Sequence, residues 1–106
     1  MTNHGLSGKL VRDKIPETIR ADGGDPNVRT LNDEEYTASL RAKLFEEVDE
    51  LLTAPVEKRT EEVADVIEVL HAMVQDYGLK WDAVEVECLR KRAERGGFEA
   101  RLWLEQ

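Results

Sequence analysis

The strongest constraint on the fold is a pair of apolar stripes separated by a proline. Over residues 36–52, and again over 63–77, apolar side chains recur at three- and four-residue steps, the spacing of one face of an α-helix. Pro55 disfavours helical backbone at Ala54, so the first helix should end there and the second should begin between Pro55 and Thr60. Because the connection is short, we expect the two helices to form an antiparallel pair.

The same two stretches carry acidic runs beside their apolar stripes. At about 100° per residue, Glu47 and Glu50 fall beside the first stripe. Glu62 falls inside the second stripe and Asp65 falls just outside it. Each pair is spaced i,i+3, and the short connection brings both pairs to about the same level. We therefore expect four carboxylates to face one another near a surface that should be buried.

These four carboxylates need a counter-charge. Desolvation and mutual repulsion both favour the protonated form, so they cannot all stay ionised alone. Oxygen ligands favour a hard divalent ion, Mg2+ or else Mn2+, which usually keeps several waters and is completed by substrate phosphates. The alternative is a solvated acidic face, which is the usual state of a single helical glutamate. Two pairs on consecutive helices favour the metal site over that alternative.

The rest of the sequence predicts two further helices. One should lie between residues 13 and 24, ended by a glycine pair, and another should run over about 81–94. Short runs at 28–31 and 98–104 are candidates for a small two-stranded β element. The expected fold class is therefore all-α, with four to five helices built around the antiparallel pair. At 106 residues the chain should form a single domain, with residues 1–8 frayed.

Composition argues against several classes of partner. The net charge of −8 is unfavourable for unaided binding to nucleic acid or to an anionic membrane. No apolar stretch is long enough to span a membrane, no signal-like run opens the chain, and Cys88 is the single cysteine. We expect a cytoplasmic protein. A chain this short would bury more apolar surface by forming a homodimer or a higher homo-oligomer.

Two groups of basic residues stand out in this acidic chain. Lys14 and Arg12 belong to a basic cluster near the start, and Arg12 has the geometry to hold a carboxylate of the acidic runs as well as a phosphate. Lys91 and Arg95 lie one turn apart near the end of the last helix, so both can reach the same anion. That position also suits the helix dipole, which needs no ligand.

The acidic pattern resembles the signature of the MazG-like all-α nucleoside triphosphate pyrophosphohydrolases, a group that includes phosphoribosyl-ATP pyrophosphohydrolase. The signature is E-E-x-x-E followed by E-x-x-D on the next helix, and this chain fills it with Glu46, Glu47, Glu50, Glu62 and Asp65. The runs Lys9-Leu10-Val11-Arg12-Asp13-Lys14-Ile15-Pro16 and Arg95-Gly96-Gly97-Phe98-Glu99 resemble a short, single-domain, house-cleaning branch of that group. The matches span the chain from Lys9 to about Leu104.

This resemblance implies an enzyme that hydrolyses a nucleoside triphosphate between the α- and β-phosphates, giving the monophosphate and pyrophosphate. In such an enzyme Glu47, Glu50, Glu62 and Asp65 would hold Mg2+, and Glu46 would orient or deprotonate the attacking water. The substrate phosphates would meet a group of cations, namely Lys91, Arg95, Lys14 and Arg12.

Three alternatives stay open at the level of the sequence. The chain resembles phosphoribosyl-ATP pyrophosphohydrolase of histidine biosynthesis as well, which would change the substrate but keep the chemistry. It could be a metal-dependent nucleotide-binding module without turnover. It could also be a structural helical oligomer whose acidic residues are only solvated.

Overall fold

The computed structural model describes residues 8–105, and across them the chain is all-α, as predicted. The elements are α1 (Ile15–Ala21), α2 (Asp33–Thr53), a 3-10 turn η1 (Val56–Lys58), α3 (Arg59–Asp76) and α4 (Trp81–Arg95). The chain divides into two compact units, one up to Met73 and one from Val74 on, and each is described by itself. The fraying expected at residues 1–8 falls, except for Gly8, outside the described residues.

α2 begins at a complete capping box. The Asn32 side chain accepts a hydrogen bond from the backbone N–H of Glu35 (2.9 Å), and the Glu35 carboxylate accepts one from the backbone N–H of Asn32 (3.1 Å). Arg29 adds an ion pair of 2.8 Å to the same carboxylate. At the other end Ala54 is extended, as the residue before Pro55 should be, so the helix ends where the sequence predicts.

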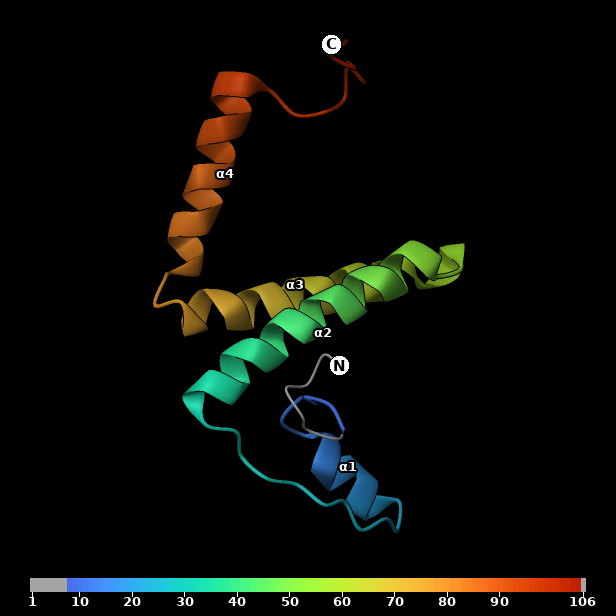
Figure 1. Ribbon diagram of the computed structural model, residues 1–106. Coiled ribbons are helices and arrows are strands. Elements are labelled where there is room, and N and C mark those ends of the chain that lie inside the picture. Colours follow the sequence, from blue (N-terminus) through green and yellow to red (C-terminus); the bar gives the residue numbers. More distant parts are fainter. Residues whose placement is uncertain (1–7, 106) are drawn as a thin grey trace. The chain divides into compact units, whose positions relative to one another are not determined.

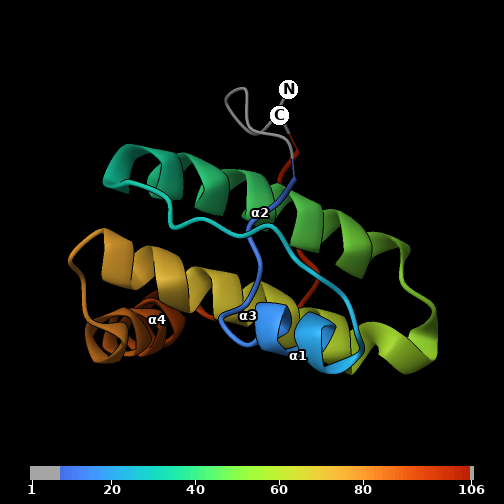
Figure 2. The same ribbon diagram turned by 90° about the horizontal axis from the view of Figure 1, so that it is seen from below.

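In the first unit α2 and α3 lie side by side and run in opposite directions (Figures 1 and 2). The core of this pair contains Leu40 of α2 and Val69 of α3, which are 3% and 8% exposed. The connection is the short η1 turn, so the last turns of α2 lie beside the first turns of α3. The two acidic runs are thereby brought to the same end of the pair.

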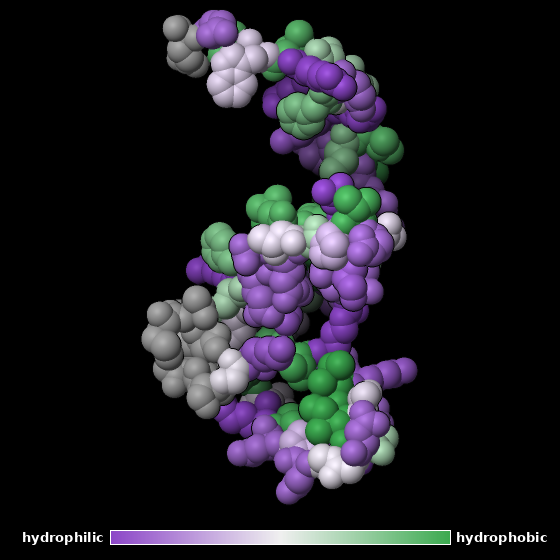
Figure 3. All heavy atoms as spheres, turned by 90° about the vertical axis from the view of Figure 1, so that its right-hand side faces the viewer, coloured by the Kyte–Doolittle hydropathy of each residue, from purple (hydrophilic) through white to green (hydrophobic). Residues whose placement is uncertain are grey.

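The segment before α2 folds around the short helix α1. Pro16 stands in its first turn, where no backbone N–H is needed. Gly23 has φ 91° and ends the helix, with Gly23 N–H bonded to Arg20 and Gly24 N–H bonded to the Ile19 carbonyl. Figure 3 shows hydrophobic side chains gathered at the level of α1.

The second unit contains the last residues of α3, then α4 and the C-terminal segment. Gly78, with φ 73°, ends α3 by the same arrangement: its N–H bonds to Gln75 and the Leu79 N–H bonds to Val74. α4 follows from Trp81 to Arg95. The sequence predicted this helix over about 81–94.

The prediction of a small two-stranded β element is wrong. Neither 28–31 nor 98–104 forms a strand in the described part of the chain. The first segment leads straight into the α2 cap and makes no ladder bonds among the described residues. In the second, the Arg101 N–H bonds to the Phe98 carbonyl in a turn, and Arg101 has φ 59°, a left-handed value that interrupts an extended run.

None of the helices between residues 8 and 105 combines the length and the apolar composition needed to cross a membrane.

Candidate metal centre

Three carboxylates of one helical turn converge on α2. Oxygen atoms of Glu46, Glu47 and Glu50 all lie within 4.8 Å of one another. The spacing i, i+1, i+4 places these side chains on adjoining strips of the helix surface, so one turn of α2 is enough to gather them. All three are residues that the sequence proposed for the site.

Glu47 is the unusual member of this group. Its side chain is buried, with 7% of the residue exposed, and its Oε2 atom has no hydrogen-bond partner among residues 8–105. Burial raises the pKa of Glu47 to about 7, with further upward contributions from a hydrogen bond to Glu50 and from the charges of Glu50 and Asp65. A buried carboxylate oxygen without a partner is costly, and a cation would satisfy it.

α3 supplies the other two predicted carboxylates. Burial raises the pKa of Glu62, and the charges of Glu50 and Asp65 and a hydrogen bond to Asp65 raise it further. Asp65 also acts on Glu47, as noted above. The carboxylates of the two helices therefore interact electrostatically across the pair, whereas the group within 4.8 Å consists of the three α2 acids and does not include Glu62 or Asp65.

Arg12 reaches this group from the N-terminal segment. Its Nη2 donates a hydrogen bond to Oδ1 of Asp65 at 2.8 Å. The sequence left open whether Arg12 would meet a carboxylate or a phosphate, and the structure places it on a carboxylate. The contact uses Oδ1 of Asp65, whose carboxyl group also hydrogen-bonds with Glu62.

Lys43 is a neighbour of the group that sequence reasoning missed. Its Nζ lies 3.2 Å from Oε1 of Glu46, and only 20% of its side chain is exposed. Its charge lowers the pKa of Glu47, opposing the effects of burial and of the other acids. The signal was present in the sequence, because Lys43 stands three and four residues before two acidic residues of the same helix.

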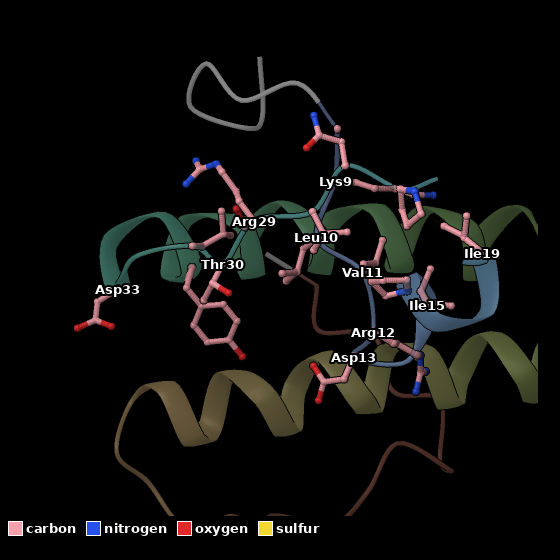
Figure 4. A pocket seen from close by; sticks show the side chains of 18 residues that line it. Lys9, Leu10, Val11, Arg12, Asp13, Ile15, Ile19, Arg29, Thr30 and Asp33 are labelled. Carbon is pink, nitrogen blue, oxygen red and sulfur yellow. The ribbon is translucent and has the colours of Figure 1, made fainter. Parts of the chain in front are cut away.

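Two hollows lie in the first unit, and the smaller of them adjoins the carboxylate group. The larger, of about 790 Å3, lies between residues 8–16, the segment before α2 and the first turns of α2 (Figure 4). The smaller, of about 380 Å3, lies between residues 8–10 and the middle of α2, where Lys43 and Glu46 line it. The hollows share four lining residues: Gly8, Lys9, Leu10 and Ser39. Glu46 lines the smaller hollow, which therefore borders the three-carboxylate group, whereas the larger hollow reaches the carboxylates only through Arg12, which contacts Asp65.

The other predicted phosphate contacts do not line these hollows. Lys14 is the exposed N-cap residue of α1 and lines neither of these hollows. Lys91 and Arg95 are exposed and stand one turn apart on α4, in the second unit. The Arg95 Nε atom lies 3.9 Å from an oxygen of Glu94, a long contact that leaves its guanidinium largely solvated.

The donor set suits a hard divalent cation. Every side chain in the group offers carboxylate oxygen, and neither histidine nor cysteine takes part in it. The unpaired, buried Oε2 of Glu47 is a ligand atom without another partner. The residues present therefore fit Mg2+ or Mn2+ better than zinc, which prefers nitrogen and sulfur ligands.

No protein-family model and no solved structure matches the chain. An uncharacterized protein of Mycolicibacterium smegmatis (strain ATCC 700084 / mc(2)155) is 63% identical to it over 46 residues. That stretch is 43% of this chain and 47% of the relative, so the match spans about half of each protein. The relative's name states no activity and no ligand.

Proposed function

We propose that the chain is a Mg2+-dependent nucleoside triphosphate pyrophosphohydrolase of the MazG-like all-α group. It would cleave between the α- and β-phosphates and release a nucleoside monophosphate and pyrophosphate. The observation that carries the proposal is the buried, unpaired Oε2 of Glu47, whose carboxylate lies close to those of Glu46 and Glu50 and interacts with the charge of Asp65 on α3. Solvated acidic residues on a helix surface would not include a buried oxygen without a partner.

The cation ligands in this proposal are two acids of α2 and two acids of α3 that interact with them electrostatically: Glu47, Glu50, Glu62 and Asp65. When bound, Mg2+ supplies a Lewis acid for phosphoryl oxygens and lowers the pKa of a bound water. Mn2+ has the same preference for oxygen ligands and would replace it. Arg12 keeps the Asp65 carboxylate oriented while the ligands assemble.

Glu46 has the role of orienting or deprotonating the attacking water. Its side chain is 40% exposed, and Lys43 binds its Oε1 at 3.2 Å. We assign its Oε2 atom to the water beside the cation ligands. Lys43 fixes the side-chain rotamer that presents this oxygen.

The substrate has space in the first unit. The larger hollow combines apolar side chains with Arg12 and Lys9, which suits a nucleoside whose phosphates point toward the carboxylates. Lys91 and Arg95 would neutralise the phosphate chain, as the family resemblance implies. We place the reaction in the cytoplasm, as house-cleaning of non-canonical nucleotides, without nucleic acid or a membrane as partner.

Self-association is part of the same proposal. Phe45 and Leu52, seven residues apart on one side of α2, are each 77% exposed. Large exposed apolar side chains at this spacing are typical of a helix that packs against another chain. A homodimer or a higher homo-oligomer would cover them.

The test is pyrophosphate release from a panel of normal and damaged nucleoside triphosphates and phosphoribosyl-ATP, with and without Mg2+. Glu47→Gln and Glu62→Gln should abolish release, whereas Glu68→Gln, an exposed acid on α3, should keep most of it. Nucleotide binding without release would show a binding module instead. Preference for phosphoribosyl-ATP would place the chain in histidine biosynthesis. Metal-independent hydrolysis would contradict the proposal.

A further inference from the structure

The smaller hollow has a charge opposite to that of the chain as a whole. The protein carries a net charge of −8, yet the charged side chains lining this hollow are two lysines, Lys9 and Lys43, and one carboxylate, Glu46. The hollow measures about 380 Å3, within the usual size range of small-ligand sites. The lining therefore carries a net positive charge in an acidic protein, with the carboxylates of Glu47 and Glu50 close to that of Glu46.

The ammonium groups retain donors for a ligand. Lys43 gives one contact to Oε1 of Glu46 at 3.2 Å, and an ammonium group has three N–H donors. Lys9 has no ion-pair partner among residues 8–105. Only 20% of the Lys43 side chain is exposed, so its charge is less screened by water than that of a surface lysine.

The position of the hollow decides which anion suits it. Glu46 lines the hollow and belongs to the three-carboxylate group, so the hollow opens directly beside the candidate cation ligands. Magnesium sites commonly combine one or two carboxylates with the oxygens of a substrate phosphate. An anion placed here would thus meet lysine donors on one side and the cation ligands on the other.

We propose that Lys9 and Lys43 form a subsite for a phosphate chain, which holds the pyrophosphate portion of the substrate and the pyrophosphate product. The inference rests on the proposed function for its biological substrate, and it adds two residues that the acidic motif does not contain. Lys43 donates to a phosphoryl oxygen while it keeps Glu46 in place. Lys9 closes the hollow from the N-terminal segment.

The competing explanation is that Lys43 only balances the charge of its acidic neighbours. Removal of a positive charge would then strengthen cation binding, because the remaining carboxylates become more negative as a group. It would leave pyrophosphate affinity unchanged once the cation site is saturated. The two explanations therefore differ in which ligand responds to the substitution.

The experiment is calorimetric titration of the whole chain with inorganic pyrophosphate at saturating Mg2+, with Mg2+ affinity measured separately. Lys9→Ala and Lys43→Ala should each weaken pyrophosphate binding at least about tenfold, with Mg2+ affinity equal to the wild type or higher. Lys43→Arg should retain most of the affinity, since it keeps the charge. Lys58→Ala, an exposed lysine of η1, is the matched control and should change neither quantity.

Pyrophosphate binding that is unchanged in both alanine variants would overturn the subsite, as would a wild type that does not bind pyrophosphate. Loss of Mg2+ affinity in parallel with pyrophosphate affinity would overturn it too, because the effect would then act through the cation. If Lys43→Ala fails to fold, the pyrophosphate affinities of Lys9→Ala and Lys43→Arg still test the subsite. Hydrolysis of nucleoside triphosphates is measured separately. If pyrophosphate binding depends on the lysines but no triphosphate is hydrolysed, the subsite is supported and the proposed enzyme activity is refuted.

Discussion

Nη2 of Arg12 lies 2.8 Å from Oδ1 of Asp65, an ion pair that joins residues 53 positions apart in the chain. It attaches the N-terminal segment to α3 at the carboxylate group. The side chains are 56% and 30% exposed, and exposed pairs of this kind contribute only about 0–1 kcal/mol to stability. Its main consequence is therefore the orientation of the Asp65 carboxylate, not the stability of the fold.

Replacing Arg12 should affect metal binding more than folding. Arg12→Ala should weaken Mg2+ binding about 10–100-fold, because partners that orient a ligand have effects of this size, while unfolding free energy should fall by about 1 kcal/mol or less. Urea unfolding and Mg2+ titration of the same sample measure both. Arg41→Ala, an exposed arginine of α2, is the control. A stability loss without a change in Mg2+ affinity would show that Arg12 only braces the segment.

Mg2+ should stabilise the folded protein, because it would bind the assembled carboxylates and not the unfolded chain. At a hundredfold excess over the dissociation constant the gain should be about 2.7 kcal/mol, seen as a higher melting temperature. Glu50→Gln and Asp65→Asn should reduce this gain, and Glu57→Gln on η1 should not. If Mg2+ raises the melting temperature equally in all of these variants, Glu50 and Asp65 do not bind the cation.

In the absence of divalent cations, Glu47 should make stability fall as pH rises from about 4.5 toward 7. Its pKa is raised from 4.5 to about 7 in the folded chain, so within this window the folded state keeps a proton that the unfolded state has lost. Each further step up in pH then favours unfolding. Saturating Mg2+ should remove this slope, because the cation favours the ionised carboxylate.

The effect must be separated from other titrating groups, since lowered pKa values such as that of Glu35 give the opposite trend. The measurement is therefore the difference in unfolding free energy between the wild type and Glu47→Gln across pH 4.5–7. If the unfolding free energies of the two proteins change with pH in the same way, the pKa of Glu47 is not raised.

Lys91 and Arg95 require a kinetic test, because the helix dipole alone would account for cations at the end of α4. If they meet substrate phosphates, alanine at either position should lower kcat/KM at least about tenfold, equivalent to about 1.4 kcal/mol. If they only complement the dipole, kinetics should stay the same and stability should fall by about 0.3–1 kcal/mol. Lys80→Ala, an exposed lysine just before α4, serves as the control for general charge effects.

Local rules in the sequence were sufficient for the helices and for the phasing of the acids. Ala54 before Pro55 ended α2, and Gly23 and Gly78 ended α1 and α3, because each signal acts within four or five residues. The same local periodicity placed Glu47 beside the apolar stripe, and that residue is buried. The two strand predictions failed because a short β-branched run specifies extended backbone but not a partner to pair with.

Tertiary structure decided the features that depend on distant residues. Two features follow from how α3 and the N-terminal segment pack on α2: the choice of Asp65 as the partner of Arg12, and the lack of a partner for Oε2 of Glu47 in the described part of the chain. The sequence by itself determined that carboxylates would gather on one face of a helix pair, since a helix repeats every 3.6 residues. Only packing decided which oxygen would be buried and unpaired, because burial is a property of neighbours that the local sequence does not contain.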